Sequence, residues 1–320
     1  MSNESVDNVL TDRILRAVSK QEKLPEFPDE ADDLPSDYEY DPDAEEEVEE
    51  VEEISENELL EILEQESSAL DTARLLFNED KVKEADTLSL DILSPQSVRD
   101  LYETGSVVLD NVVDKSVIQG TLYIAYSRMM FIILITLIYQ AAHDEASVMQ
   151  NNGEFQPAQE YRQEGDDQYR DNKARDDRTV WLNPADESKE SSRPKISQLL
   201  KMLQHKLLQD LSQIIHLNGN VEYQLAYYHP QNARYERHRD AFPTSEREDT
   251  TQRRVTAIIY LNPDWVQGDG GELRLFGKNS APHQDVEPIA SRLVVFLSGV
   301  VDHAVISASK PRYALTAWIR

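Results

Sequence analysis

The C-terminal third of the chain consists of short apolar runs separated by turn residues, and this pattern constrains the fold more than any other feature. The runs are residues 255–261, 272–276, 292–297, 303–305 and 313–319. Their composition and alternation are typical of β-strands. Residues 268–271 predict a turn, after which the second run would pair with the first. Short strands in succession predict an all-β barrel or a double-sheet jelly roll for this part.

The tripeptide His238-Arg239-Asp240, together with the distant His303, predicts a metal site. In an extended segment, side chains two positions apart project to the same side, so His238 and Asp240 would grip one ion together. Two imidazoles and one carboxylate leave open positions on an octahedral metal, as in non-haem Fe(II) oxygenases. A closed zinc site usually uses thiolates, and this chain has no cysteine. A surface strand with a salt-bridged His-x-Asp pair remains the alternative.

Arg312 opens the last strand-like run. The residues that share one face of this strand, by the period of two, are Arg312, Ala314, Thr316 and Trp318. An arginine that points into a barrel needs an anionic partner, and its planar fork suits a carboxylate. The sequence leaves open whether this carboxylate belongs to a ligand or to an Asp or Glu of the protein.

The stretch from about residue 220 to residue 320 resembles the catalytic core of the 2-oxoglutarate- and Fe(II)-dependent prolyl 4-hydroxylases, and most of all the hypoxia-inducible-factor-type enzymes and their microbial relatives. The shared motifs are Tyr227-Tyr228, Tyr235-x-Arg237-His238-x-Asp240, Tyr260-Leu261-Asn262-x-x-Trp265, Gly270-Gly271-x-Leu273-Arg274-Leu275-Phe276, Arg292-Leu293, His303 and Arg312-Tyr313-Ala314-Leu315-Thr316-x-Trp318. Upstream, Arg175-Asp176-Asp177-Arg178-Thr179-Val180-Trp181 is similar to the family's Arg-Gly-Asp-Lys-x-x-Trp run. The resemblance implies a mainly β fold with flanking helices (α+β) around a double-stranded β-helix core of the jelly-roll or cupin-like kind.

The resemblance also implies the chemistry. His238, Asp240 and His303 would be the catalytic iron ligands, and Arg312 would pair with the distal carboxylate of 2-oxoglutarate. The residues that would bind or line the co-substrate are Tyr228, Tyr260 and Thr316. The implied dioxygenase would use Fe(II), 2-oxoglutarate and O2, with L-ascorbate in support, to hydroxylate a prolyl residue of a protein substrate and release succinate and CO2. Hydroxylation of another amino acid or a small molecule, or a catalytically silent scaffold, are the alternatives.

The sequence departs from the family pattern in two places. Asp176 replaces the glycine of the Arg-Gly-Asp run, so we expect a different loop conformation, because glycine reaches backbone angles that Asp adopts less readily. Residues 244–254 form a polar and heavily charged segment that is longer than in the animal enzymes. These departures concern the substrate rather than the metal site.

The N-terminal region is strongly acidic. Residues 29–66 contain 20 Asp and Glu residues and no Lys or Arg, in a chain whose net charge is −29. Such a segment repels itself and buries little, so we expect residues 1–85 to be largely disordered. Residues 86–320 would then form the hydroxylase-like domain, with the dioxygenase core at about residues 219–320. The acidic region is either a solvated tail or a docking arm for a basic partner, and nucleic acid is not expected because its phosphates would be repelled.

The absence of cysteine and of a charged-then-apolar leader predicts a cytoplasmic or nuclear protein. The apolar run 129–139 is shorter than the ~20 residues that a membrane span needs, so a buried helix or strand is preferred. A membrane segment or a gene-model artefact are the alternatives for this run.

Two helices are expected ahead of the core. Ser94 followed by Pro95 predicts a helix start, and Gly105 predicts its end. Pro194 precedes an amphipathic helix whose apolar residues recur at three- and four-residue steps as far as Ile215. Its apolar stripe would pack on the outer face of the barrel.

Overall fold

The computed structural model describes residues 69–113, 128–158, 160–161, 168–169, 174–249, 251–277 and 282–320. All of them belong to one compact unit of the chain, Ile54–Arg320. Of the N-terminal region for which disorder is expected, residues 1–68 lie outside the described residues. Residues 69–85 pack with the domain, because Leu76 and Phe77 are buried in its core and Phe77 forms a β-bridge with Ile215.

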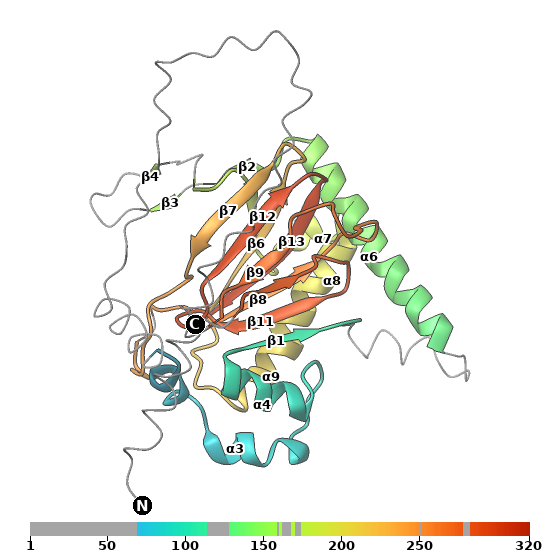
Figure 1. Cartoon of the computed structure of the whole chain (residues 1–320). Coiled ribbons are helices and arrows are strands. Elements are labelled where there is room, and N and C mark those ends of the chain that lie inside the picture. Colours follow the sequence, from blue (N-terminus) through green and yellow to red (C-terminus); the bar gives the residue numbers. More distant parts are fainter. Residues whose placement is uncertain are drawn as a thin grey trace, which may run out of the picture. The chain divides into compact units, whose positions relative to one another are not determined.

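Two antiparallel sheets form the centre of the domain (Figure 1). The larger sheet contains, in spatial order, β1 (Ser106–Leu109), β11 (Leu293–Leu297), β8 (Val255–Tyr260), β13 (Arg312–Ile319), β6 (Val221–Tyr228), β5 (Arg178–Leu182) and β2 (Gln156–Pro157). The smaller sheet contains β10 (Gln284–Val286), β9 (Leu273–Leu275), β12 (His303–Ala308) and β7 (Ala233–His238). A separate pair is formed by β3 (Glu160–Tyr161) and β4 (Gln168–Tyr169). The chain repeatedly crosses between the two sheets, which confirms the predicted jelly roll.

The predicted pairing of run 255–261 with run 272–276 is wrong. β8 lies between β11 and β13 in the larger sheet, whereas β9 pairs with β10 and β12 in the smaller one. The connection that contains the predicted turn therefore carries the chain from one sheet to the other. It bridges to β12 through Gly270 and Ala308. The alternating pattern identified the strands, but it could not say which strands pair, because pairing depends on contacts distant in sequence.

One long helix and several short ones accompany the sheets. They are α3 (Glu79–Lys83), η1 (Ala85–Thr87), α4 (Pro95–Thr104), α6 (Arg128–Asn151), α7 (Glu187–Glu190), α8 (Pro194–Met202), η2 (Leu203–Leu207) and α9 (Leu208–Ser212). The predicted ends of α4 are confirmed: the Ser94 side chain accepts a hydrogen bond from the backbone N–H of Ser97, and Gly105 adopts a left-handed φ of 83°. A cap of this kind satisfies backbone groups that the helix leaves without partners.

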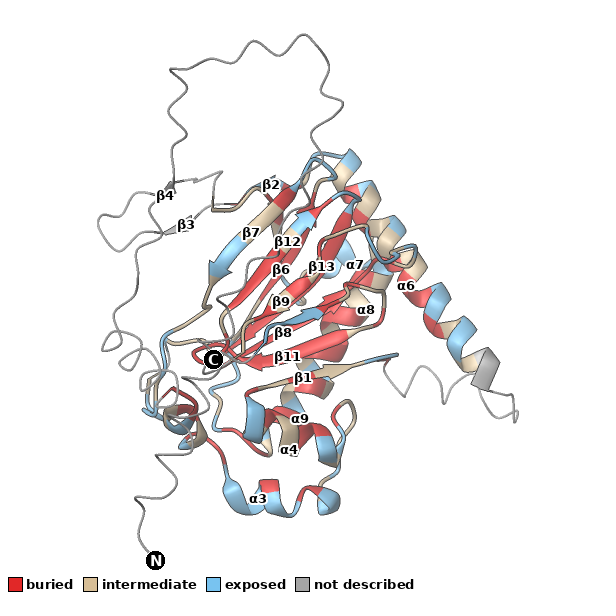
Figure 2. Cartoon of the chain, in the orientation of Figure 1, coloured by how far each residue is buried: buried red, intermediate tan, exposed pale blue. Residues whose placement is uncertain are grey.

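The core lies between the larger sheet and the helices behind it. Tyr139 of α6, Leu207 of η2 and Leu225 of β6 are fully buried in one cluster. In Figure 2 the central strands β8, β11 and β13 of the larger sheet are buried throughout, while the edge strand β7 of the smaller sheet is mostly half-buried or exposed. Along β13, alternate residues such as Leu315 and Ala317 belong to this core, which leaves Arg312 and its neighbours by period two for the other face.

The amphipathic stripe that follows Pro194 is confirmed, with one irregularity. The predicted apolar positions of the stripe, all of which are buried, are Ile196, Leu199, Leu200, Leu203, Leu207, Leu211, Ile214 and Ile215. Between α8 and α9 the backbone forms a π-helical turn, η2, rather than one continuous α-helix. The spacing of the apolar residues did not predict this π-helical turn, because the apolar side chains stay on the same face on both sides of it.

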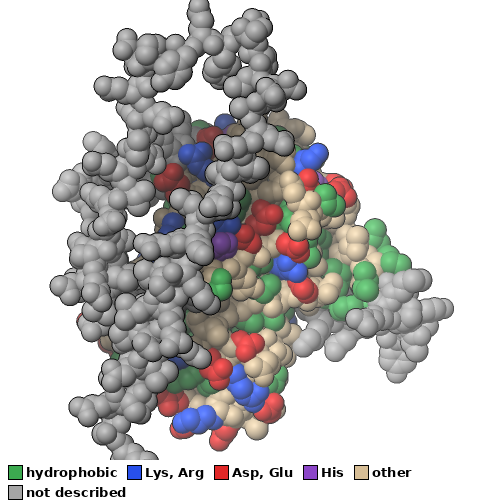
Figure 3. Space-filling model, in the orientation of Figure 1, with side chains coloured by type: hydrophobic (Ala, Val, Ile, Leu, Met, Phe, Trp, Pro, Cys, Tyr) green, Lys and Arg blue, Asp and Glu red, His purple; other side chains and the backbone are tan. Residues whose placement is uncertain are grey.

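The apolar run 129–139 lies in α6, which is buried on one side only. Ile135, Ile138 and Tyr139 are buried, whereas Ile132 and Leu137 are exposed by 47% and 61%. Figure 3 shows hydrophobic side chains gathered over this part of the surface. The preferred interpretation of this run as a buried helix is therefore confirmed for one side of α6, whereas the other side is exposed. Within the described residues, no helix is both long and apolar enough to cross a membrane.

Candidate metal centre

A cavity of about 420 Å³ opens between the two sheets. Its walls come from both sheets and from the segment before β5, and include Arg175, Asp177, Gln224, Tyr228, Tyr235, His238, Asp240, Thr256, His303, Arg312, Thr316 and Trp318. Titratable and hydrogen-bonding side chains thus converge on a concave space, which is the usual setting of an active site.

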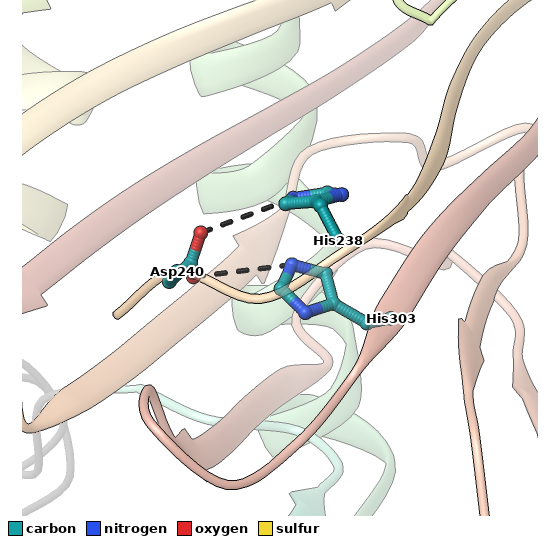
Figure 4. A group of neighbouring side chains, drawn as sticks. All are labelled: His238, Asp240 and His303. Carbon is teal, nitrogen blue, oxygen red and sulfur yellow. Dashed lines mark ion pairs between the residues drawn. The ribbon is translucent and has the colours of Figure 1, made fainter. Parts of the chain in front are cut away.

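His238, Asp240 and His303 meet at the wall of this cavity (Figure 4). His238 ends β7 and His303 begins β12, and the two residues are direct partners in the antiparallel pair. Asp240 follows the end of β7, so the turn after the strand, rather than strand alternation alone, brings its carboxylate back toward the imidazoles. One potential ligand atom from each residue lies within 4.8 Å of the others, which is close enough to surround one ion.

Both imidazoles are held in the orientation that a metal ligand requires. Nδ1 of His238 lies 2.8 Å from the carbonyl oxygen of Glu236, and Nδ1 of His303 lies 3.2 Å from that of Val301. A carbonyl oxygen only accepts, so Nδ1 donates in each ring and Nε2 keeps its lone pair. Nε2 of His238 is 3.8 Å from Oδ1 of Asp240, and Nε2 of His303 is 3.9 Å from Oδ2 of Asp240.

Burial and the neighbouring His303 lower the pKa of His238 to about 3, against the opposing effect of Asp240. The ring is therefore neutral at physiological pH, as ligation demands. Burial alone would raise the pKa of Asp240, but the two imidazoles and hydrogen bonds from Thr256 and Trp318 hold it below its usual value. Oδ2 of Asp240 accepts from the Thr256 hydroxyl at 2.7 Å and from the Trp318 indole N–H at 3.0 Å.

This donor set suits Fe(II). Two neutral imidazole nitrogens and one carboxylate oxygen would hold the ion and leave positions for a co-substrate and O2. Among the described residues, His238, Asp240 and His303 form the group of His, Asp or Glu side chains close enough together to hold one metal ion. The alternative of a solvated surface pair does not fit the geometry, because all three side chains face the cavity and Asp240 is nearly enclosed.

Arg312, the predicted anion-binding residue, lies in the same cavity and is only 2% exposed. Its Nε donates to the carbonyl oxygen of Gly271 at 2.6 Å. Its guanidinium carbon lies 4.6 Å from the ring centre of Tyr228 and 5.1 Å from that of Tyr260. Among the described residues, no carboxylate forms an ion pair with Arg312. Within this part of the chain the structure therefore does not support an internal salt bridge.

The three predicted co-substrate residues surround this arginine in different ways. Tyr228 and Thr316 line the cavity, whereas Tyr260 lies behind the wall and contacts Arg312. The Tyr260 hydroxyl is buried without a hydrogen-bond partner, and burial raises its pKa to about 12. A buried hydroxyl without a partner is costly, and an anion bound to Arg312 would supply one. The residues present therefore fit 2-oxoglutarate as well as iron.

Sequence reasoning did not assign the residues that support His238. Arg175 forms a two-pronged ion pair with the fully buried Asp177, at 2.8 and 2.9 Å. Its guanidinium carbon lies 4.2 Å from the ring centre of Tyr235, which stacks on the His238 ring at 3.6 Å. The signal for this chain of contacts was the Arg-x-Asp spacing in the upstream motif. Asp176 between them does not need the conformational freedom of glycine, because its φ is not positive.

Comparison with known proteins agrees with this geometry. Residues 223–320 match the model of the 2OG-Fe(II) oxygenase superfamily. The hypoxia-inducible factor prolyl hydroxylase of Caenorhabditis elegans is 26% identical over 241 residues, which are 74% of this chain and 29% of the relative. Egl nine homolog 1 of Rattus norvegicus is 30% identical over 183 residues, which are 56% of this chain and 50% of the relative. The chain thus spans half or less of the length of these relatives.

Two solved structures are also similar. A prolyl-4-hydroxylase of Pseudomonas putida is 28% identical, with a TM-score of 0.50, and the match covers 70% of this chain and 97% of that one. A prolyl hydroxylase of Trichoplax adhaerens, solved with a hypoxia-inducible factor peptide, is 20% identical with a TM-score of 0.52, and the match covers 75% and 90%. The second likeness concerns the fold alone. Together with the side chains around the cavity, these similarities establish that residues 223–320 form a domain of the 2OG-Fe(II) oxygenase superfamily, with resemblance to its prolyl hydroxylases.

Proposed function

We propose that the protein is a 2-oxoglutarate- and Fe(II)-dependent dioxygenase that hydroxylates a prolyl residue of a protein substrate and releases succinate and CO2. The observation that carries this proposal is the position of Arg312. A buried guanidinium without a described carboxylate partner shares one cavity with the His238, Asp240 and His303 cluster. A small dicarboxylate with a metal-chelating end satisfies both features at once.

In this proposal each side chain has a defined task. His238, Asp240 and His303 hold Fe(II), which with 2-oxoglutarate and O2 supplies the oxidising chemistry. Arg312 pairs with the distal carboxylate of 2-oxoglutarate and fixes its direction in the cavity before O2 binds. Tyr260 contacts the Arg312 guanidinium from behind the cavity wall and would help to hold its direction.

The remaining walls orient and shield the site. Thr256 and Trp318 keep the Asp240 carboxylate turned toward the imidazoles. Tyr228 and Thr316 line the cavity beside the co-substrate position. Because Arg312 is almost fully buried, its pairing with an anion in this cavity would be stronger than at the surface.

A proline-containing protein is the proposed substrate, because the similar proteins of C. elegans and P. putida are named as prolyl hydroxylases. L-Ascorbate is proposed as the supporting reductant on the family resemblance. We further propose a cytoplasmic or nuclear location and, for the acidic region, a basic protein partner. The domain division at about residue 85 and the dioxygenase core at about residues 219–320 are likewise proposals.

An anaerobic titration with Fe(II) and 2-oxoglutarate tests the proposed site. We expect a weak visible charge-transfer band in the wild-type protein and none in His303→Ala, while circular dichroism shows that both are folded. Under air, wild type should release succinate slowly without substrate, and Asp240→Ala should not. Undiminished succinate release by Asp240→Ala would contradict the assignment.

A panel of peptides then tests the substrate. Proline-containing peptides should gain one oxygen atom by mass spectrometry, and matched peptides with alanine in place of proline should not. Iron and 2-oxoglutarate binding without any peptide oxidation would favour another amino acid or a small molecule as the substrate. Failure to bind iron in a folded protein would favour the catalytically silent scaffold.

A further inference from the structure

An ionic cluster lies directly behind the two histidines, on the opposite side from the cavity. Asp302 immediately precedes His303, and its two carboxylate oxygens accept hydrogen bonds from two arginines. Arg239 Nε donates to Oδ1 at 2.6 Å, and Arg237 donates to Oδ2 through Nε at 2.9 Å and through Nη2 at 2.6 Å. The two arginines flank His238 in sequence, so alternation turns them away from the face that His238 occupies.

The cluster lies at the end of an irregular strand pair. His238 and His303 are direct partners, but the register between β7 and β12 shifts between His303 and Val305 and again between Val305 and Ala308. Irregularities of this kind interrupt the ladder of backbone hydrogen bonds that would otherwise fix one strand against the other. Asp302 therefore adds a side-chain link between the end of β7 and the start of β12 next to an interrupted ladder.

The same carboxylate residue also engages a third strand. The Asp302 carbonyl oxygen accepts a hydrogen bond from the backbone N–H of Phe276, just after β9. The Arg237 guanidinium carbon lies 4.5 Å from the ring centre of Phe276. The ends of β7, β9 and β12 are thus joined through one acidic residue and its two arginines.

We infer that Asp302 is a positioning residue: with Arg237 and Arg239 it holds His238 and His303 at the separation that metal binding requires. Single surface ion pairs contribute little to stability, so a general stabilising role would be small. The Asp302 carboxylate bridges two guanidinium groups next to His238 and His303 in the chain. Its main effect would therefore be on the distance between the two imidazoles. This inference rests on the proposed metal site and deepens it, because it names what keeps the two imidazoles in place.

The chain offers a matched control in the same sheet. Arg274 of β9 and Asp285 of β10 are direct cross-strand partners and form a two-pronged ion pair at 2.8 and 2.8 Å. The Asp285 side chain is 37% exposed and that of Asp302 is 20% exposed. Asp285→Asn therefore removes the same charge and a similar ion pair from the same sheet without touching the ends of β7 or β12.

The test measures binding of Co(II), a stable substitute for Fe(II), to the full chain by calorimetry. Asp302→Asn should weaken Co(II) binding roughly 10-fold, the lower end of what loss of a supporting contact costs a metal site. Asp285→Asn should leave it unchanged within about twofold, and Asp302→Glu, which restores the charge, should recover most of the loss. Equal Co(II) affinity in Asp302→Asn and Asp285→Asn would overturn the inference.

A double variant separates geometry from charge. If Asp302 acted only by neutralising two cations near the metal, Arg237→Gln/Arg239→Gln would bind Co(II) as well as wild type or better. If it acts by positioning, the double variant should bind Co(II) about as weakly as Asp302→Asn. Wild-type affinity in the double variant would therefore overturn the positioning role.

A measurement without metal keeps this inference distinct from the proposed function. Amide hydrogen exchange at residues 236–240 and 301–305 of the metal-free protein should be faster in Asp302→Asn than in Asp285→Asn. Equal exchange rates in Asp302→Asn and Asp285→Asn would contradict the positioning role of Asp302, even if the wild-type protein binds Co(II). Failure of wild type to bind Co(II), with faster exchange in Asp302→Asn, would overturn the proposed metal site while leaving the strand connection supported.

Discussion

At the scale of single residues, the site depends on groups whose charge state is set by burial. His238 is neutral because burial and His303 lower its pKa, and Arg312 is enclosed beside the Tyr228 and Tyr260 rings. These residues could be predicted from the sequence because they stand together in the motifs of a known family, whereas His-x-Asp alone also fitted a surface ion pair. Their supports, such as the Trp318 hydrogen bond to Asp240, could not, because they join residues distant in sequence.

Arg312→Lys should raise the Michaelis constant for 2-oxoglutarate while leaving Co(II) binding intact. Lysine keeps the charge but cannot form the planar fork or the contact with the Gly271 carbonyl. Loss of one charge-assisted hydrogen bond with the charge retained costs about 1.5 kcal/mol, so the expected increase is roughly 10-fold. Steady-state succinate release at varied 2-oxoglutarate measures it, and a change below about threefold would speak against the carboxylate role of Arg312.

The metal-free protein should lose stability in mild acid. The pKa of His238 is lowered to about 3 in the folded protein, below its unfolded value of 6.5. Between these values the unfolded chain binds a proton that the folded protein does not, so stability falls as the pH falls through this window. Urea unfolding at pH 7 and pH 5 measures the effect. His238→Gln should flatten the dependence, and an equally steep dependence in that variant would assign it to other groups.

At the scale of elements, the connection between β8 and β9 is more than a turn. Gly270 has a φ of 70°, and a side chain there would place its Cβ 2.1 Å from the Ser307 carbonyl oxygen. The next residue, Gly271, supplies the carbonyl oxygen that accepts from Arg312. The sequence predicted a bend at these glycines, but only the tertiary structure shows that they must approach β12 and β13 closely.

Gly270→Ala should destabilise the fold and weaken 2-oxoglutarate binding together. Gly268→Ala is the matched control, because Gly268 also has a positive φ, of 99°, but open space around it. Both variants bear the backbone strain of about 1 kcal/mol, whereas only Gly270→Ala must also displace the β12 backbone. Thermal unfolding should therefore show the lower midpoint for Gly270→Ala. Equal midpoints would mean that the connection adapts without disturbing β12.

At the scale of the whole molecule, buried carboxylates join helices to segments far away in sequence. Asp210 of α9 is 1% exposed and accepts hydrogen bonds from the backbone N–H groups of Asp91, Ile92 and Leu93. These contacts fix the segment that leads into α4 against the helical layer behind the larger sheet. Nothing in the local sequence distinguishes Asp210 from a solvent-facing helix residue.

Asp210→Ala should lower the free energy of unfolding by about 2–4 kcal/mol, because it leaves one buried and two partly buried N–H donors without partners. Asp80→Asn is the control, since the Asp80 side chain is 90% exposed and its ion pair with Lys83 spans 3.9 Å. Urea unfolding gives both values. A loss below about 1 kcal/mol for Asp210→Ala would show that water replaces the carboxylate.

The sequence by itself predicted five strands of the C-terminal part and the ends of α4, and its family motifs predicted the jelly-roll class and the four site residues His238, Asp240, His303 and Arg312. These predictions rest on period-two alternation, capping residues and motif spacing, which can be read along the chain. The tertiary structure decided that β8 and β9 lie in different sheets, that α6 buries only one side, and that Asp302 lies behind the histidines. Those features depend on which distant segments meet, and pairing between distant segments leaves no periodic trace in the chain.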